Sequence, residues 1–202
     1  MGFGKVLTGI AAALVAADAV YTAVETPTNY LRPPGAYSEK DFMARCIKCG
    51  KCAEACPHIA IHMAKDLDMA QAGTPYIDAE SQACKLCPDF FCAAVCPTKA
   101  LEVPADRAHV DMGYAKINEN KCIAFKGMRC EVCYRICPLI DEAITINFSA
   151  LEDDDIHTRF LPTINKHKCV GCGLCVQRCV VHDPRSAIRI VTKAEQEQNK
   201  KK

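Results

Sequence analysis

The chain has 202 residues, of which 50% are hydrophobic and 16 are cysteines, and its formal net charge is +1. This near-neutral charge, without an arginine-rich or aromatic-interleaved patch, lacks the electrostatic footprint of nucleic-acid binding, and we expect no nucleic-acid partner. The length is sufficient for one or two domains with a core of their own.

The N-terminal part of the chain is an apolar stretch over residues 6–24, interrupted by Asp18. It is long enough to span a bilayer, which takes about 17–25 residues. Its many alanines also fit the hydrophobic part of a secretory signal, and Ala17 and Ala19 supply an A-x-A-like cleavage site. We therefore expect residues 1–25 to be a signal peptide or a membrane-anchor helix. A buried helix of a soluble protein is the remaining alternative.

A Pro-rich linker follows over residues 26–37, and its Pro-Pro-Gly sequence breaks helices and favours extended backbone. A short helix is expected next, with Ser38 as its N-cap and Asp41 at the third helical position. This helix leads the chain into the first group of cysteines.

That group, which we call run one, reads C-x2-C-x2-C-x3-C-P from Cys46 to Pro57 and matches the ligand run of bacterial-type ferredoxins. The fourth cysteine of such a run usually binds a different cluster, so one run predicts a second. Three further runs are found, and together they use all 16 cysteines. The four runs are Cys46, Cys49, Cys52, Cys56 (run one); Cys84, Cys87, Cys92, Cys96 (run two); Cys122, Cys130, Cys133, Cys137 (run three); and Cys169, Cys172, Cys175, Cys179 (run four).

Other uses of cysteine fit this pattern less well. Disulfide scaffolds are short and do not space their cysteines in matching quartets. Zinc ribbons use two pairs separated by a long finger, whereas these quartets are compact and three of them end in Cys-Pro. No C-x-x-C-H sequence for covalent haem is present. We therefore expect four [4Fe-4S] clusters, held by iron–thiolate bonds, whose binding supplies much of the folding free energy.

Short alternating segments flank the runs and are typical of strands. They are expected at 75–78 and 100–103 around run two, 115–118 and 143–146 around run three, and 162–165 and 187–191 around run four. Run one has no such segment before it, and the linker takes that place. The predicted fold class is α+β, with tandem bacterial-ferredoxin-like modules over residues 38–192, an N-terminal apolar helix and an irregular polar tail at 193–202.

Some segments lie outside this repeat. Residues 65–73 are expected to form an extra helical turn or two, and 102–113 a loop. The acidic residues 152–155 are either a solvated face or a docking surface for a basic electron-transfer partner. His58 and His62 follow run one, and we expect packed or exposed side chains there in preference to a ligand or proton relay.

The chain resembles the NapG/MauM-type ferredoxins, which accompany periplasmic nitrate reductase and methylamine-oxidation systems. The resemblance covers roughly residues 31–191. The segments that carry it are Leu31-Arg-Pro-Pro-Gly-Ala36, Cys46-Ile-Lys-Cys-Gly-Lys-Cys52, Gly73-Thr-Pro-Tyr76, the whole of run three from Cys122 to Pro138, Phe160-Leu-Pro-Thr163, and Cys169-Val-Gly-Cys-Gly-Leu-Cys175.

This resemblance implies an iron–sulfur protein on the periplasmic side of the inner membrane, anchored or exported. It would pass electrons from a NapH-like membrane quinol dehydrogenase toward a c-type cytochrome or terminal reductase. The alternatives are a permanent electron-transfer subunit of a catalytic oxidoreductase and a cytoplasmic polyferredoxin. The family's precursors usually carry a twin-arginine signal, and no Arg-Arg pair precedes Leu31, which leaves the export route open. No catalytic constellation accompanies the cysteines, so any enzyme activity would belong to the larger complex.

The runs exchange their fourth cysteines, but their spacing does not fix which runs pair. Linear order couples one with two and three with four. The chain also resembles four-cluster subunits of molybdenum-enzyme electron chains, and that resemblance implies a nested scheme, which we favour. Its ligand sets are Cys46, Cys49, Cys52 with Cys179; Cys84, Cys87, Cys92 with Cys137; Cys122, Cys130, Cys133 with Cys96; and Cys169, Cys172, Cys175 with Cys56. The run-one cluster, which follows the linker most closely, is expected to be the first acceptor.

Overall fold

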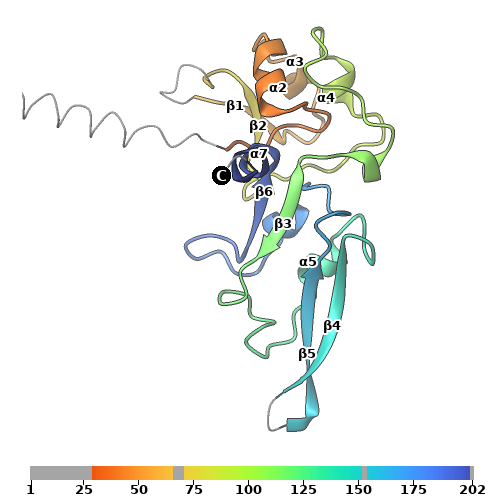
Figure 1. Cartoon of the computed structure of the whole chain (residues 1–202), viewed down its shortest axis with the longest axis vertical. Helices are drawn as coiled ribbons and strands as arrows, with labels where there is room; N and C mark the ends of the chain where they lie inside the picture. The colour runs from red at the N-terminus through yellow and green to blue at the C-terminus, as the bar shows by residue number, and fades with distance from the viewer. Residues whose placement is uncertain (1–28, 66–70, 152–153, 201–202) are drawn as a thin grey trace, which may run out of the picture.

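The computed structural model describes residues 29–65, 71–151 and 154–200, with side chains left out at 150–157. Two modules of similar construction lie one above the other and give the molecule an elongated shape (Figure 1). The N-terminal helix predicted within residues 1–25 lies outside the described residues. Among the helices that are described, none has the length and apolar character to cross a bilayer.

The first module contains runs one and two and two paired strands. Its elements are α2 (Glu39–Arg45), α3 (Lys51–Glu54), β1 (Ile61–Met63), β2 (Pro75–Ile77), α4 (Phe91–Ala94) and the 3₁₀ turn η1 (Arg107–His109). β1 and β2 are antiparallel. The linker adds single bridges, Leu31 to Ile77 and Ala36 to Leu101, so it does take the place of a strand before run one. The segment after run two is limited to the bridge at Leu101, where a strand over 100–103 was predicted.

The second module repeats this plan with longer strands. Its elements are β3 (Gly113–Ile117), α5 (Val132–Arg135), β4 (Ile144–Leu151), β5 (Asp154–Ile164), α6 (Leu174–Gln177) and β6 (Ile188–Thr192). The strand before run three pairs with the strand after run four, since β3 and β6 are antiparallel. The strand after run three pairs with the strand before run four in the same way, as β4 and β5. Runs three and four are thereby folded around each other.

The β4–β5 hairpin extends well beyond the predicted strands and forms the lower end of the molecule (Figure 1). Phe148 and Phe160 stack edge to face with ring centroids 5.3 Å apart. Arg129, from the long gap inside run three, lies over the Phe160 ring at 4.5 Å. The hairpin and the run-three loop therefore support each other, and part of the acidic 152–155 segment belongs to β5.

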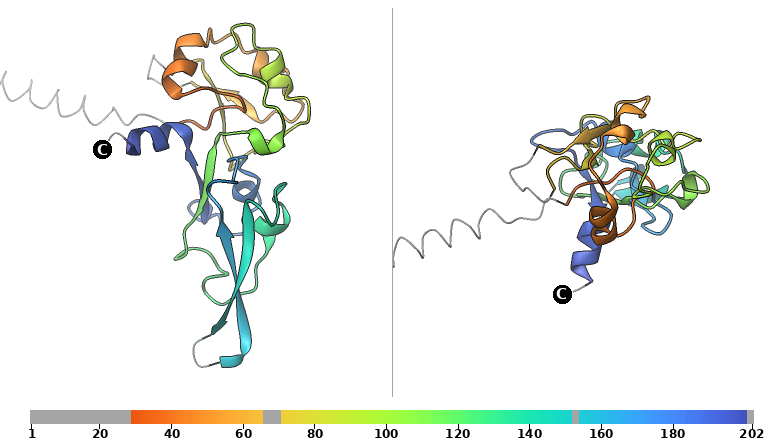
Figure 2. Two further views of the ribbon diagram at one scale, coloured as in Figure 1. Left: turned by 45° about the vertical axis from the view of Figure 1, so that its right-hand side comes forward. Right: turned by 90° about the horizontal axis from the view of Figure 1, so that it is seen from above.

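The two chain segments that flank the modules differ in how well they were predicted. Ser38 caps α2 as expected, because its hydroxyl accepts the Asp41 N–H at 3.2 Å. The prediction of an irregular tail over residues 193–202 was wrong for most of that segment, because Lys193–Asn199 forms helix α7. The Thr192 hydroxyl caps this helix by accepting the Glu195 N–H. In Figure 2, α7 projects sideways from the level at which the modules meet.

The linker arginine Arg32 is one of the few buried charges of the described chain, with 6% of its surface exposed. Its guanidinium pairs with Glu39 and donates to the Thr74 hydroxyl at 2.8 Å. It also lies over the fully buried Phe42 ring at 4.8 Å. Arg32 therefore ties the linker, α2 and the start of β2 into one unit.

We expect Arg32→Ala to destabilise the first module by about 3 kcal/mol, because it leaves the shielded Glu39 carboxylate without its partner. The anaerobic denaturant midpoint measures this loss. Arg45→Ala is the matched control, since Arg45 is exposed and stacks over Tyr37 at 4.4 Å. Its loss should cost less than about 1 kcal/mol. Equal shifts for the two variants would contradict this role of Arg32.

Candidate iron–sulfur sites

Each cysteine run is a tight loop that ends in a short helix carrying the third cysteine. The helices α3, α4, α5 and α6 hold Cys52, Cys92, Cys133 and Cys175, respectively. In runs one and four, the residue before the helix is a glycine in the left-handed region, at φ 77° and 84°. This turn needs positive φ, which glycine adopts without steric cost.

The three leading cysteines of run one meet the fourth cysteine of run two. Cys46, Cys49 and Cys52 line one cavity together with Cys96, and the rest of its wall includes Phe42 and Leu101. We call these four thiols the run-one group.

The reciprocal exchange forms the run-two group. Cys84, Cys87 and Cys92 share a cavity with Cys56. Its wall is largely apolar, with Phe90 and Phe91 among its lining residues.

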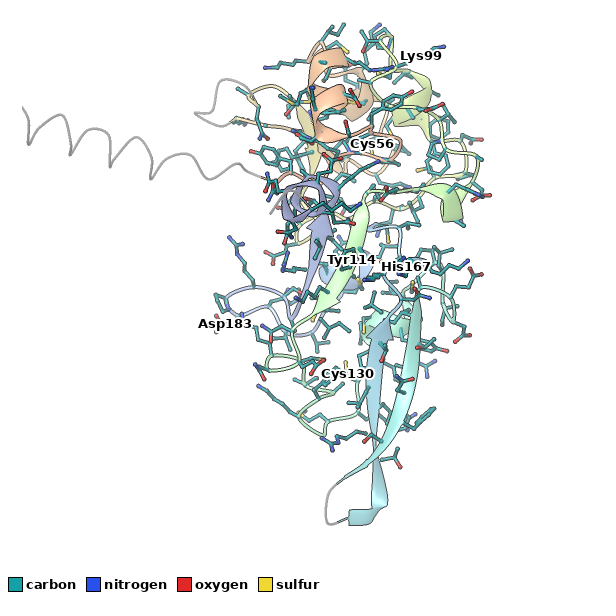
Figure 3. All side chains as sticks on the ribbon, in the orientation of Figure 1. Cys56, Lys99, Tyr114, Cys130, His167 and Asp183 are labelled. Carbon is teal, nitrogen blue, oxygen red and sulfur yellow. The ribbon has the colours of Figure 1, made fainter. Side chains whose placement is uncertain are left out.

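The second module makes the same exchange between runs three and four. Cys137 shares a cavity with Cys169, Cys172 and Cys175, which we call the run-four group, and Cys133 of run three also lines this cavity. Cys179 is buried in the same core cluster as Cys122 and Cys133, with Cys130 packed against it. Cys137, Cys169 and Cys175 also pack against this cluster, and with those three assigned above, we call the remaining four thiols the run-three group. Figure 3 shows the separation of the modules, with Cys56 in the upper one and Cys130 in the lower.

The arrangement of the thiols differs from the nested pairing that the resemblance implies. Cys56 lies with run two and not with run four, and Cys96 lies with run one and not with run three. Cys137 lies with run four, and Cys179 is left for run three. The physical reason is the strand pairing, because β1–β2 folds run one onto run two and β3–β6 and β4–β5 fold run three onto run four.

Burial changes the chemistry of these thiols. Loss of solvent raises the pKa of Cys84, Cys92, Cys133 and Cys172 to about 12 and that of Cys52 to about 11. Neighbouring thiols raise these values further, as Cys56 does at Cys92. Thiolates in such places need a cation beside them, because burial disfavours the charged form. Iron supplies that charge in iron–sulfur proteins.

Backbone N–H groups point at several of the sulfurs. Ala115 donates to Cys169 Sγ at 3.3 Å and Ala60 to Cys56 Sγ at 3.4 Å. At Cys96, burial alone would raise the pKa, but backbone hydrogen bonds from Leu101 and its neighbours outweigh it and the pKa is lowered. Such hydrogen bonds stabilise thiolate charge and help to set the reduction potential of a bound cluster.

The four groups fit an iron–sulfur cluster. None of the 16 cysteines forms a disulfide. Within the described residues, no set of three or more His, Cys, Asp or Glu side chains converges tightly enough for one metal ion. The thiols of three groups surround apolar cavities instead, and those of the run-three group lie in one core cluster. A zinc ion would draw its thiolates to about 2.3 Å, whereas a cubane takes them on separate corners.

One of the two histidines after run one is exposed, and the other packs against an aromatic ring. His58 is exposed and borders the run-two cavity, and its carbonyl accepts the Gln82 side-chain amide. His62 packs against Tyr76 with ring centroids 5.8 Å apart. The hydrogen bond of Gln82 could not be predicted from the sequence, because its partner is 24 positions away.

Comparison with known proteins agrees with this division of the chain. A family model described as a 4Fe-4S dicluster domain matches twice, at residues 45–100 and 126–183. The first match contains runs one and two, and the second contains run four and most of run three. The two matches thus divide the chain between runs two and three, as the strand pairing does.

Curated relatives cover most of the chain. "Ferredoxin-type protein NapG" of Haemophilus influenzae is 43% identical over 164 residues, which are 80% of this chain and 58% of that protein. NapG of Escherichia coli is 42% identical over 163 residues and 70% of its length. "Methylamine utilization ferredoxin-type protein MauM" of Methylophilus methylotrophus is 41% identical over 165 residues and 71% of its length.

Two dicluster domains with paired cysteine runs define a ferredoxin-type electron-transfer protein with 4Fe-4S domains. The sequence identity of 41–43% to these relatives extends over about four fifths of the chain, and it indicates the family more specifically than the cysteine spacing alone. The chain belongs to the NapG/MauM family of ferredoxin-type proteins.

Proposed function

We propose that the chain binds four [4Fe-4S] clusters through its 16 cysteines, one cluster in each of the four groups described above. When bound, a cluster accepts and releases single electrons. The cluster-binding domain is residues 38–192, after a linker at 26–37 and a signal or membrane-anchor helix at 1–25. The protein carries electrons from a NapH-like membrane quinol dehydrogenase to a c-type cytochrome or terminal reductase on the periplasmic side.

One observation carries this proposal. In the first module, each group combines three cysteines of one run with the fourth of the other. In the second module, Cys137 joins the cavity of Cys169, Cys172 and Cys175, and Cys179 shares a core cluster with Cys122 and Cys133. This division uses all 16 thiols, four to a group. With four thiolates for four irons, no coordination position is left for a substrate. The chain's own residues hold, bury and separate the redox groups, and the reaction that they support is electron transfer between partners.

The direction of flow follows from the nature of the partners. Quinols are oxidised at the membrane, so the membrane partner is the donor and the periplasmic protein is the acceptor. Two features of this chain support a membrane location: its apolar residues 6–24 and its membership of the NapG/MauM family. The acceptor differs among relatives, since MauM is named for methylamine utilization.

The test is to isolate membranes anaerobically from cells that produce the chain and to add a short-chain quinol. We expect the chain to co-purify with a polytopic quinol dehydrogenase and its visible absorbance to bleach on quinol addition. Membranes that lack this partner are the control and should give no bleaching. Co-purification with a cofactor-bearing catalytic subunit instead would support the permanent-subunit alternative, and cytoplasmic recovery after spheroplasting would support the polyferredoxin alternative. Either result would overturn the proposal.

A further inference from the structure

The two modules meet at the loop of run four. The N–H of Cys84 donates to the carbonyl of Cys172 at 3.0 Å, and this bond joins the run-two group to the run-four group. Cys172 and Leu174 are buried in the same core cluster as Cys84 and Cys92. The core of the first module thus continues into run four, and these two groups adjoin across the module boundary.

Inside each module, the two groups adjoin through their short helices. Helix α3 packs against α4, which places Cys52 of the run-one group near Cys92 of the run-two group. Helix α5 packs against α6, which places Cys133 of the run-three group near Cys175 of the run-four group. Each module therefore holds its own two groups side by side.

We propose that the four thiol groups form one unbranched series, in the order run one, run two, run four, run three, and that the contact of Gly173 with Ala79 holds the middle step. This inference rests on the electron-transfer function proposed above. One electron leaves a reduced donor, passes the groups in this order or its reverse, and is taken up by an oxidised acceptor. No bond forms or breaks, and no proton is needed for charge transfer between neighbouring groups.

The middle step depends on a close approach that only glycine allows. A Cβ built at Gly173 would lie 2.6 Å from the Ala79 Cβ and 3.5 Å from the Ala83 Cβ. The first distance is shorter than any ordinary carbon–carbon contact. The Gln177 side-chain amide fixes the same contact by donating to the Ser81 carbonyl at 3.0 Å. The loop of run four is thus pressed against residues 79–84 that lead into run two.

The run-one end of the series is open at a thiol, while the thiols at the joint between the modules are covered. Cys49 of the run-one group is exposed, and Ile47 beside it is 61% exposed. Met128, in the long gap of run three, is 60% exposed. Cys84 and Cys172 at the middle step are each 8% exposed. Cys49 is the one exposed thiol among the 16, so the run-one group is the end of the series that a partner reaches most directly.

The matched variants are Gly173→Ala and Gly50→Ala in the full, cluster-loaded chain. Gly50 stands in the same place of the motif in run one and has φ +77, close to the +84 of Gly173. A Cβ at Gly50 would meet nothing within 4 Å. Both substitutions strain the backbone alike, but only Gly173→Ala pushes the modules apart. Ala79→Val adds bulk to the same contact from the side of the first module, and it leaves every glycine in place.

The first measurement is hydrogen exchange at the Cys84 amide, which does not depend on electron transfer. The second is electron redistribution after a photoreductant delivers one electron, followed by rapid-freeze paramagnetic resonance. We expect faster Cys84 exchange and several-fold slower redistribution between modules in Gly173→Ala and Ala79→Val, with unchanged iron content. Gly50→Ala strains the run-one loop in the same way, and with its iron content intact it should match the wild type in Cys84 exchange and in redistribution between the modules.

Redistribution at the wild-type rate in iron-replete Gly173→Ala and Ala79→Val would overturn the series, as would equal slowing by Gly50→Ala. If Gly173→Ala loses iron, the redistribution rate of Ala79→Val alone decides whether the series stands. The photoreductant replaces the membrane partner, so this result is independent of the quinol donor. A wild-type chain without iron would instead reject the proposed function itself.

Discussion

Cys56→Ser is expected to abolish cluster binding in the run-two group and to leave the run-four group loaded. Cys56 lines the cavity of Cys84, Cys87 and Cys92, where burial raises the pKa of all three thiols and the charge of Cys56 adds to that rise. A serine hydroxyl is not ionised at neutral pH and is a poor ligand for iron. We expect the loss of about one cluster's iron per chain, together with the paramagnetic signal of one group.

Double variants show which group has been lost. Cys87→Ser should lose the same signal, and Cys56→Ser combined with Cys87→Ser should lose no more iron than either alone, because both act on one group. Cys56→Ser combined with Cys175→Ser should lose twice as much. The nested pairing requires the opposite pattern, with additive loss in the first pair and a single loss in the second.

Removing iron and sulfide is expected to unfold most of the chain. The buried core is rich in cysteine and alanine, and few of its fully buried side chains are as large as Phe42 or Leu86. Structural metal sites in small domains contribute about 10–16 kcal/mol of apparent binding free energy, and such domains are unfolded without metal. Four groups in one chain should have at least that effect.

Far-ultraviolet circular dichroism before and after chelation measures the loss, with thermal scans as the second readout. We expect the apo chain to show no cooperative transition and to recover its spectrum on anaerobic reconstitution with iron and sulfide. Reconstitution with zinc alone is the control and should not restore it. An apo chain that keeps a cooperative melt would show that side-chain packing is sufficient for the fold.

The local features of this fold could be predicted because they depend on neighbouring residues. The spacing of the cysteines, the Ser38 cap and the linker in place of a strand all follow from short motifs. Helix α7 also had a signal in Thr192 and Glu195, which have the spacing of a capping box. The sequence also indicated that β4 is long, since the apolar residues Ile144, Ile146 and Phe148 alternate with polar ones as they do in a strand.

The pairing of the runs could not be predicted in the same way. Cys56 is ten residues from Cys46 along the chain but lies with Cys84, and only the β1–β2 pairing decides this. The resemblance to other four-cluster proteins implied the nested scheme. The spacing within the four runs is compatible with either topology, so the sequence alone could not decide between them. The contact of Gly173 with Ala79 is equally long-range, and the motif that contains Gly173 is shared with Gly50, which has no such contact.

The most direct test of this account is a count of iron and acid-labile sulfide in the full chain purified without oxygen. We predict about four irons and four sulfides for each of the four cysteine groups, with no zinc. Reduced samples should show magnetic interaction between neighbouring clusters, because each group adjoins another. Zinc without sulfide, or iron for only one cluster in each module, would contradict the account.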